Sequence, residues 1–249
     1  MQGYRDDGVV LRTQKLGEAD RIITLLTRQN GRVRAVAKGV RRTKSRFGAR
    51  LEPFTHVDVM LHPGRSLDVI TQAEVIRPYG APLAEDYPRY TAGTAMLETA
   101  ERLTPMEKEP ALRQFLLLIG GLRTLSETGE DAREPRLVLD AYLLRSLAVA
   151  GYAPALEECS HCGASGEAKR LTAFAVAAGG MVCADCRPPG AASPAPQTVA
   201  LMLALLRGDW DGAMRSERRH RVECSGLVAA YLQWHLEHSI RSLRHVERA

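Results

Sequence analysis

The spacing of hydrophobic residues along the chain changes near residue 80. Before that point, apolar and polar residues alternate with a period of two or form short apolar runs, which is typical of β-strands. Asn30-Gly31 separates two of these runs and predicts a hairpin turn. The five predicted strands are residues 3–13, 21–28, 33–37, 55–61 and 67–75.

Five short strands with turn signals between them indicate a small β-barrel over residues 1–80. This is the size of an OB-fold. An SH3-like barrel has a similar number of strands, so the periodicity alone leaves the two barrel types open.

Residues 81–249 follow the helical period of 3.6 instead. The predicted helices are residues 90–103, 111–125, 135–148 and 227–243. We therefore predict an α+β protein in which a barrel domain, residues 1–80, precedes a helical domain, residues 81–249. No run approaches the roughly 18 apolar residues of a membrane helix, and the N-terminus does not resemble a signal peptide. We expect a cytoplasmic protein that does not contact a membrane.

The positive charge is concentrated in the barrel region. Residues 1–80 hold 15 Lys and Arg against 8 Asp and Glu, whereas the rest of the chain holds 19 against 21. Residues 28–50 alone contain nine cations and no carboxylate. A solvated loop is the ordinary interpretation of a charge run, but a run this long without a carboxylate favours binding of nucleic acid.

The candidate nucleic-acid contacts lie around a loop that Gly39 and Gly48 bracket. Its cations would neutralise phosphates, and Phe47 is placed to stack on an exposed base. Aromatic residues make up only 5% of the chain, so we expect weak sequence preference and a steep salt dependence. The candidate residues are Arg34, Lys38, Arg41, Arg42, Lys44, Arg46, Phe47 and Arg50.

A second basic cluster precedes the predicted last helix. It is either a solvated helix start, an accessory DNA contact or a dock for an acidic peptide. Its residues are Arg215, Arg218, Arg219, His220 and Arg221.

Two Cys-x-x-Cys pairs, twenty residues apart, interrupt the helical region. Each pair offers two sulfurs from one tight turn, which is the arrangement of a four-thiolate zinc site. Four thiolates leave no position for a catalytic water, so we predict one structural zinc ion in a module at about residues 156–190. The predicted ligands are Cys159, Cys162, Cys183 and Cys186, with His161 as a less favoured alternative.

No phosphate-binding loop, nucleophile elbow or zinc-protease motif occurs in the sequence. Asp6 and Asp7 are neighbours on a predicted strand, so their side chains point apart and form a poor metal pair. We therefore predict a protein that acts by binding and not as an enzyme.

The sequence resembles the RecO family of bacterial recombination mediators. The segments that carry the resemblance are Gly8–Leu11, Gly17–Thr27, Asn30–Val33, Ala37–Ser45 with its Lys-Gly-Val-Arg-Arg core, Leu51–Phe54, Ala73-Glu74 and the cysteine pairs. The resemblance implies an OB-fold, a helical C-terminal domain and a zinc module. It also implies binding of single- and double-stranded DNA at Lys38, Arg41, Arg42, Lys44 and Arg46.

The same resemblance implies annealing of complementary strands and cooperation with RecR and single-strand-binding protein to load RecA, hence association with the nucleoid. An RNA-binding translation or ribosome-assembly factor is the main alternative, because small barrels and zinc modules also serve there. A nuclease ranks third.

Overall fold

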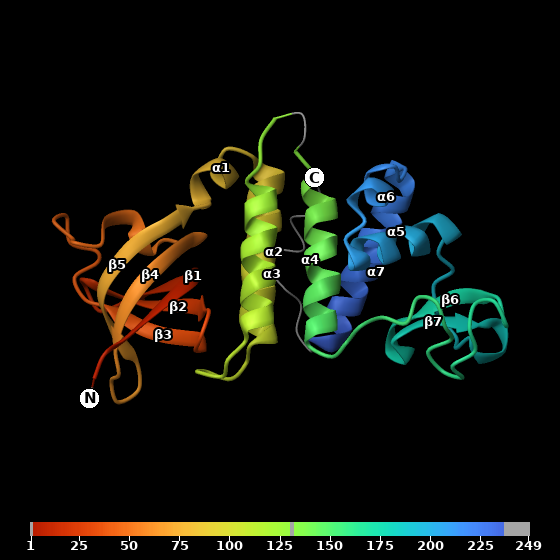
Figure 1. The fold of residues 1–249 in the computed structure, drawn as a ribbon, viewed down its shortest axis with the longest axis horizontal. Coiled ribbons are helices and arrows are strands. Elements are labelled where there is room, and N and C mark those ends of the chain that lie inside the picture. Colours follow the sequence, from red (N-terminus) through yellow and green to blue (C-terminus); the bar gives the residue numbers. More distant parts are fainter. Residues whose placement is uncertain (1, 130–131, 237–249) are drawn as a thin grey trace. The chain divides into compact units, whose positions relative to one another are not determined.

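A computed structural model describes residues 2–129 and 132–236 of the chain (Figure 1). The chain forms two compact units, Met1–Ala132 and Arg133–Ala249. No helix in the described ranges is long and apolar enough to cross a membrane.

The first unit contains a closed five-stranded barrel with the strand order β1-β2-β3-β5-β4. Neighbouring strands are antiparallel except β3 and β5, which pair in parallel over a short stretch. The predicted OB-type barrel is therefore confirmed. The strands are β1 (Tyr4–Leu16), β2 (Asp20–Thr27), β3 (Gly31–Ala37), β4 (Thr55–His62) and β5 (Asp68–Pro78).

The strand patterns account for the core of the barrel. Side chains along β3 alternate between buried and half-buried, as expected for a strand that faces the core on one side. The end of β2 is buried on both faces because a helix, α3 (Leu112–Leu125), packs on its outer side. The core includes Val10, Ile23, Leu25, Val33, Val57, Leu61 and Ile70.

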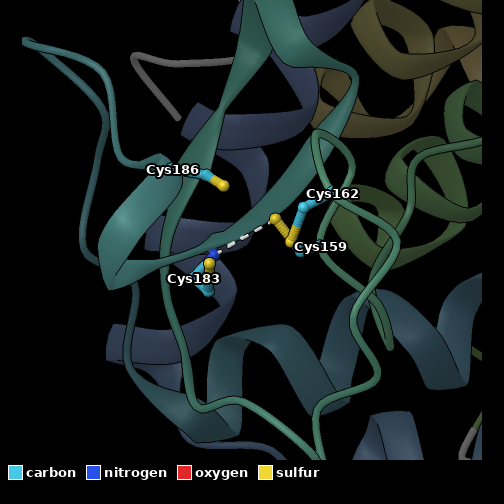
Figure 2. A group of neighbouring side chains, drawn as sticks. All are labelled: Cys159, Cys162, Cys183 and Cys186. Carbon is cyan, nitrogen blue, oxygen red and sulfur yellow. Dashed lines mark hydrogen bonds between the residues drawn. The ribbon is translucent and has the colours of Figure 1, made fainter.

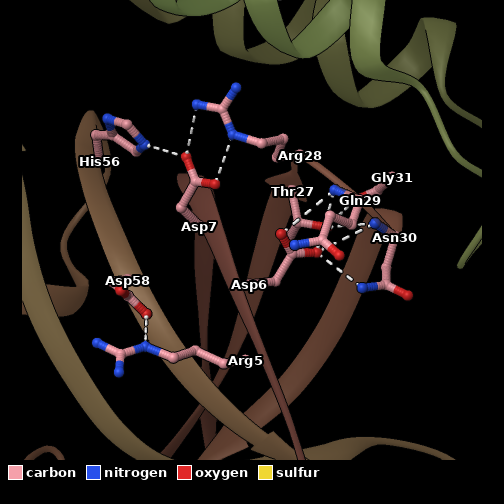
Figure 3. Close-up of polar contacts among 10 residues, drawn as sticks. All are labelled: Arg5, Asp6, Asp7, Thr27, Arg28, Gln29, Asn30, Gly31, His56 and Asp58. Atoms are coloured by element: carbon pink, nitrogen blue, oxygen red, sulfur yellow. Dashed lines mark hydrogen bonds and ion pairs between the residues drawn. The ribbon is translucent and has the colours of Figure 1, made fainter.

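The adjacent carboxylates of β1 fix two different parts of the barrel (Figure 3). Asp6 is buried and accepts hydrogen bonds from the backbone of the β2–β3 turn and from the Asn30 side chain at 2.8 Å. Asp7 accepts from Arg28 at 2.7 Å and contacts His56 at 2.9 Å. Burial alone would raise the pKa of Asp7, but these two hydrogen bonds outweigh it and lower that pKa. The two carboxylates thus point apart.

Three helices complete the first unit: α1 (Gly80–Ala84), α2 (Tyr87–Leu103) and α3 (Leu112–Leu125). Asp86 caps α2 by accepting the Arg89 amide at 2.9 Å. Gly93 allows α2 to pack closely, because a Cβ there would lie 3.0 Å from the Phe54 ring and 3.2 Å from Leu83.

The second unit consists of packed helices and a small hairpin. Helices α4, α5 and α7 contact one another, and β6 and β7 form a two-stranded antiparallel sheet. The elements are α4 (Pro135–Val149), β6 (Leu171–Ala175), β7 (Gly180–Cys183), α5 (Pro196–Arg207), α6 (Trp210–Met214) and α7 (Arg218–His235). Short 3-10 helices are η1 (Gly48–Leu51) in the first unit and η2 (Val176–Ala178) and η3 (Ala184–Cys186) in the second.

The start of the last helix differs from the sequence prediction. The last helix begins at Arg218 and not near residue 227, so four residues of the second basic cluster form its first turn, and the fifth, Arg215, lies before it at the end of α6. The end of the helix predicted up to residue 243 lies outside the described residues. The short helices α1 and α6, and α5, were not predicted.

A buried carboxylate joins α4 to α7. Asp140 is 3% exposed and accepts a hydrogen bond from the Ser225 hydroxyl at 2.6 Å. Burial raises the pKa of Asp140 to about 7, although the Ser225 hydroxyl and the nearby Arg136 oppose the shift. The folded state therefore holds a proton between about pH 4 and 7, where the unfolded chain has lost it.

We predict that the second unit becomes less stable as the pH rises through this range, because only the folded state has to keep the proton on Asp140. Asp140→Asn removes the titrating group, so the variant gains stability relative to the parent between about pH 4 and 7. Each unit of pKa shift corresponds to about 1.4 kcal/mol, so the full difference is a few kcal/mol. Urea unfolding of both proteins across this range measures it. A difference that does not change with pH would contradict the prediction.

Candidate nucleic-acid interface and candidate metal centre

Residues 38–50 follow strand β3 and are here called the basic loop. The loop is tied to the turn between β1 and β2. The Gly39 amide donates to Asp20 Oδ1 at 2.7 Å, and the Arg41 amide donates to the Ala19 carbonyl at 3.0 Å. The Arg41 guanidinium donates to the carbonyls of Gly17 and Glu18 at 3.3 and 2.8 Å. The loop therefore has a defined path over the barrel.

Phe47 does not lie where the sequence prediction placed it. Its side chain is only 2% exposed and belongs to the barrel core, together with Val40 and Leu51. A ring in this position cannot stack on a base. The prediction of base stacking by Phe47 is therefore wrong, and its physical role is to anchor the loop in the core.

The cations of the basic loop have no carboxylate partner within the described residues. Lys38, Arg42 and Lys44 are exposed. Arg46 lies over the Phe47 ring at 4.8 Å, and Arg50 donates to the backbone carbonyl of Arg46 at 3.1 Å. None of these contacts pairs a cation of the loop with a carboxylate, so the loop keeps a positive field.

The preceding cations are engaged within the barrel unit. Arg34 pairs with Glu107 at 3.3 Å, and the Arg32 guanidinium donates to the Pro105 carbonyl. Both partners belong to residues 104–111, here called the connector, which joins α2 to α3. The Lys108 amide also donates to the Arg32 carbonyl at 2.9 Å. The connector thus occupies the outer side of β3 at these positions.

The residues of the second basic cluster differ in their contacts, since some are paired or buried and others are exposed. The Arg221 guanidinium bonds to Glu134, to the Ser216 hydroxyl at 3.0 Å and to the Met214 carbonyl at 2.7 Å. Arg219 pairs with Glu217 at 3.0 Å, and His220 is buried. Arg215 and Arg218 are exposed, and neither forms an ion pair with a described residue. Arg221 therefore ties α7 to the start of α4.

The four paired cysteines lie together (Figure 2). One sulfur from each lies within 4.8 Å of the others. Cys159 and Cys162 come from the loop before β6, Cys183 ends β7, and Cys186 ends the following 3-10 helix. The antiparallel pairing of β6 and β7 brings the second pair of cysteines back beside the first. This cluster could hold a metal ion.

The thiols influence one another's ionisation. Backbone amides, first that of Cys162 and then that of Cys183, lower the pKa of the Cys159 thiol to about 6. The neighbouring thiol of Cys183 and burial raise the pKa of Cys186 to about 12. Because four thiolates this close repel one another, full ionisation requires a bound cation.

The remaining candidates lie outside this cluster. His161 is exposed and does not belong to the group of possible ligands. Cys224 is fully buried within α7, where burial raises its pKa well above the usual range, so it packs as an apolar residue.

Sequence reasoning missed two residues that contact the candidate interface. Asp20 binds the amide of Gly39, and Glu107 pairs with Arg34. A carboxylate close to a basic loop was the only available signal for Asp20. Nothing in the local sequence indicates Glu107, because it lies 73 residues from its partner.

Comparison with known proteins gives matches over most of the chain. Residues 1–79 match the family model Recombination protein O N terminal, and residues 84–244 match Recombination protein O C terminal. The chain is 70% identical over 249 residues to the DNA repair protein RecO of Thermobifida fusca, covering 100% of both chains. It is 62% identical to the proteins of that name from Frankia casuarinae and Streptomyces griseus, again over 100% of both chains.

We predict that Phe47 supports the barrel more than it supports any ligand. Phe47→Ala removes a buried ring and should reduce the free energy of unfolding by about 3–5 kcal/mol. Thr43→Ala, at an exposed position of the same loop, should leave this energy unchanged. Urea unfolding measures both. An unaltered stability of Phe47→Ala, with weaker binding of single-stranded DNA, would restore the stacking role.

Proposed function

Because the chain belongs to the RecO family of DNA repair proteins, we propose that it binds single- and double-stranded DNA through the basic loop. The observation that carries this proposal is a loop whose cations have no carboxylate partner in the described part of the chain. These cations are Lys38, Arg41, Arg42, Lys44, Arg46 and Arg50.

Phosphate neutralisation is the proposed source of affinity. Cations that lie along a sugar-phosphate chain release its condensed counterions, and this gain depends steeply on salt. Phe47 is the loop's single aromatic residue and it is buried, so the loop offers no stacking platform. Binding should therefore depend little on base sequence.

We assign different roles to the remaining candidates. Arg215 and Arg218 are the members of the second basic cluster that can provide an accessory DNA contact. Arg34, Arg219 and Arg221 are bound to carboxylates, so a phosphate must compete for them. Asp6 and Asp7 already serve the barrel, which supports a function by binding and not by hydrolysis.

The family resemblance extends the proposal to strand annealing. A cationic surface that lowers the repulsion between two phosphate chains can speed their pairing. We propose that the protein anneals complementary strands and works with RecR to load RecA onto DNA that single-strand-binding protein covers. DNA binding would associate it with the nucleoid.

We propose that the cysteine cluster holds one structural zinc ion. In a tetrahedral four-thiolate site, Zn–S distances of about 2.3 Å place the sulfurs about 3.8 Å apart. The observed upper limit of 4.8 Å between the sulfurs fits such a site after slight closure. Zinc would supply the positive charge that four thiolates need, and its closed coordination shell would brace the hairpin.

Metal analysis tests the zinc assignment. We expect one zinc ion per chain in the purified protein, and we expect Cys183→Ser to lose it and to unfold at a lower temperature. Cys224→Ala, which alters a buried cysteine outside the cluster, should keep the zinc. Parent protein purified without bound zinc from a zinc-containing medium would contradict the assignment.

The salt dependence of binding tests the DNA interface. We predict that Arg42→Ala with Lys44→Ala weakens binding to a labelled oligonucleotide of any sequence. The slope of log K against log salt should become shallower by about 0.7 per lost contact on a single strand. Fluorescence anisotropy at several salt concentrations measures both quantities.

Arg77→Ala with Arg123→Ala is the matched control. Both arginines are exposed residues of the same unit, so the net charge falls equally. The control should keep the parental slope. An unchanged slope in the loop variant would remove the loop from the interface, and clear preference for RNA of equal length would count against a role in DNA repair.

A further inference from the structure

The turn between β1 and β2 makes four hydrogen bonds with the basic loop. One acceptor is the carboxylate of Asp20, and the other three are backbone carbonyls of residues 17–19. The donors are the backbone amides of Gly39 and Arg41 and one guanidinium nitrogen of Arg41, at the start of the loop. The turn therefore determines the direction in which the loop leaves strand β3.

Arg41 differs from its neighbour Arg42 in this respect. The Arg41 guanidinium uses one of its nitrogens to bind the carbonyls of Gly17 and Glu18. Contact with a phosphate through that nitrogen would require these bonds to break. Arg42 is exposed, and its side chain forms no ion pair with a described residue.

Asp20 is an unexpected residue beside a surface for a polyanion. A carboxylate there weakens the positive field that attracts phosphates. Asp20 accepts the Gly39 amide at 2.7 Å, and Gly39 has a φ of +67°, a conformation that the amide contact helps to fix. The position of the loop thus depends on a group whose charge opposes binding.

We propose that Asp20 and Arg41 are positioning residues of the DNA-binding site, which hold the basic loop so that Arg42 and Lys44 reach the phosphates together. The proposal rests on the function proposed above. It separates the cations of the loop into one that orders the backbone and others that contact DNA.

Three variants that each remove one negative charge test the proposal. Asp20→Ala loses the acceptor, and Asp20→Asn keeps an acceptor oxygen. Glu18→Ala removes an exposed carboxylate of the adjoining turn, whose backbone carbonyl, and not its side chain, bonds to the described part of the loop. Electrostatics alone predicts unchanged or tighter binding for all three. Positioning predicts that Asp20→Ala binds about fivefold more weakly, because a preorganising hydrogen bond is lost.

The expected result is that only Asp20→Ala weakens binding, while Asp20→Asn and Glu18→Ala bind at least as tightly as the parent. Hydrogen exchange of the amides in residues 39–46 should accelerate in Asp20→Ala alone. Circular dichroism checks that each variant is folded. Equal affinities for Asp20→Ala and Glu18→Ala would overturn the proposal.

Arg41→Ala provides an independent readout. A positioning role predicts weaker binding with a salt slope close to that of the parent, whereas Arg42→Ala should make the slope shallower by about 0.7 on a single strand. Equal changes of slope in the two variants would show that Arg41 is a phosphate contact. Absence of DNA binding by the parent protein would refute the proposed function itself, a result distinct from either of these.

Discussion

A loop whose positive charge must stay available can be fixed only by contacts that do not neutralise that charge. A carboxylate on each arginine would order the loop and abolish its field. The structure uses buried apolar side chains instead, with Val40 and Phe47 inserted into the barrel core. Backbone carbonyls of the β1–β2 turn hold Arg41 without neutralising it. The rest of the barrel provides the core and the turn that make these contacts possible.

Much of the fold followed from local pattern. The alternation of apolar residues and the Asn30-Gly31 turn indicated the strands, because burial on one face imposes a period of two. The two Cys-x-x-Cys pairs indicated a cluster of four cysteines, since each pair holds its two sulfurs in one turn. Features of this kind depend on residues that are close in the sequence, so they could be predicted from it.

The remaining features depend on partners far along the chain. Phe47 has the same sequence context whether its ring points into the core or toward solvent, and the core residues that receive it come from other strands. Arg34 and Arg221 have basic neighbours in sequence, but their carboxylate partners lie 73 and 87 residues away. Charge counts therefore overestimated the number of cations available for a ligand.

The connector also sets a border to the cationic surface. Glu107 faces Arg34, and a Cβ on Gly31 would lie 1.7 Å from the Glu109 carbonyl, so the connector packs directly against the first residue of β3. OB-folds commonly receive ligands on the face of strands 2 and 3, and here acidic and backbone groups occupy part of that face. A strand bound as proposed would consequently meet Glu107 and the connector backbone at this edge of the barrel.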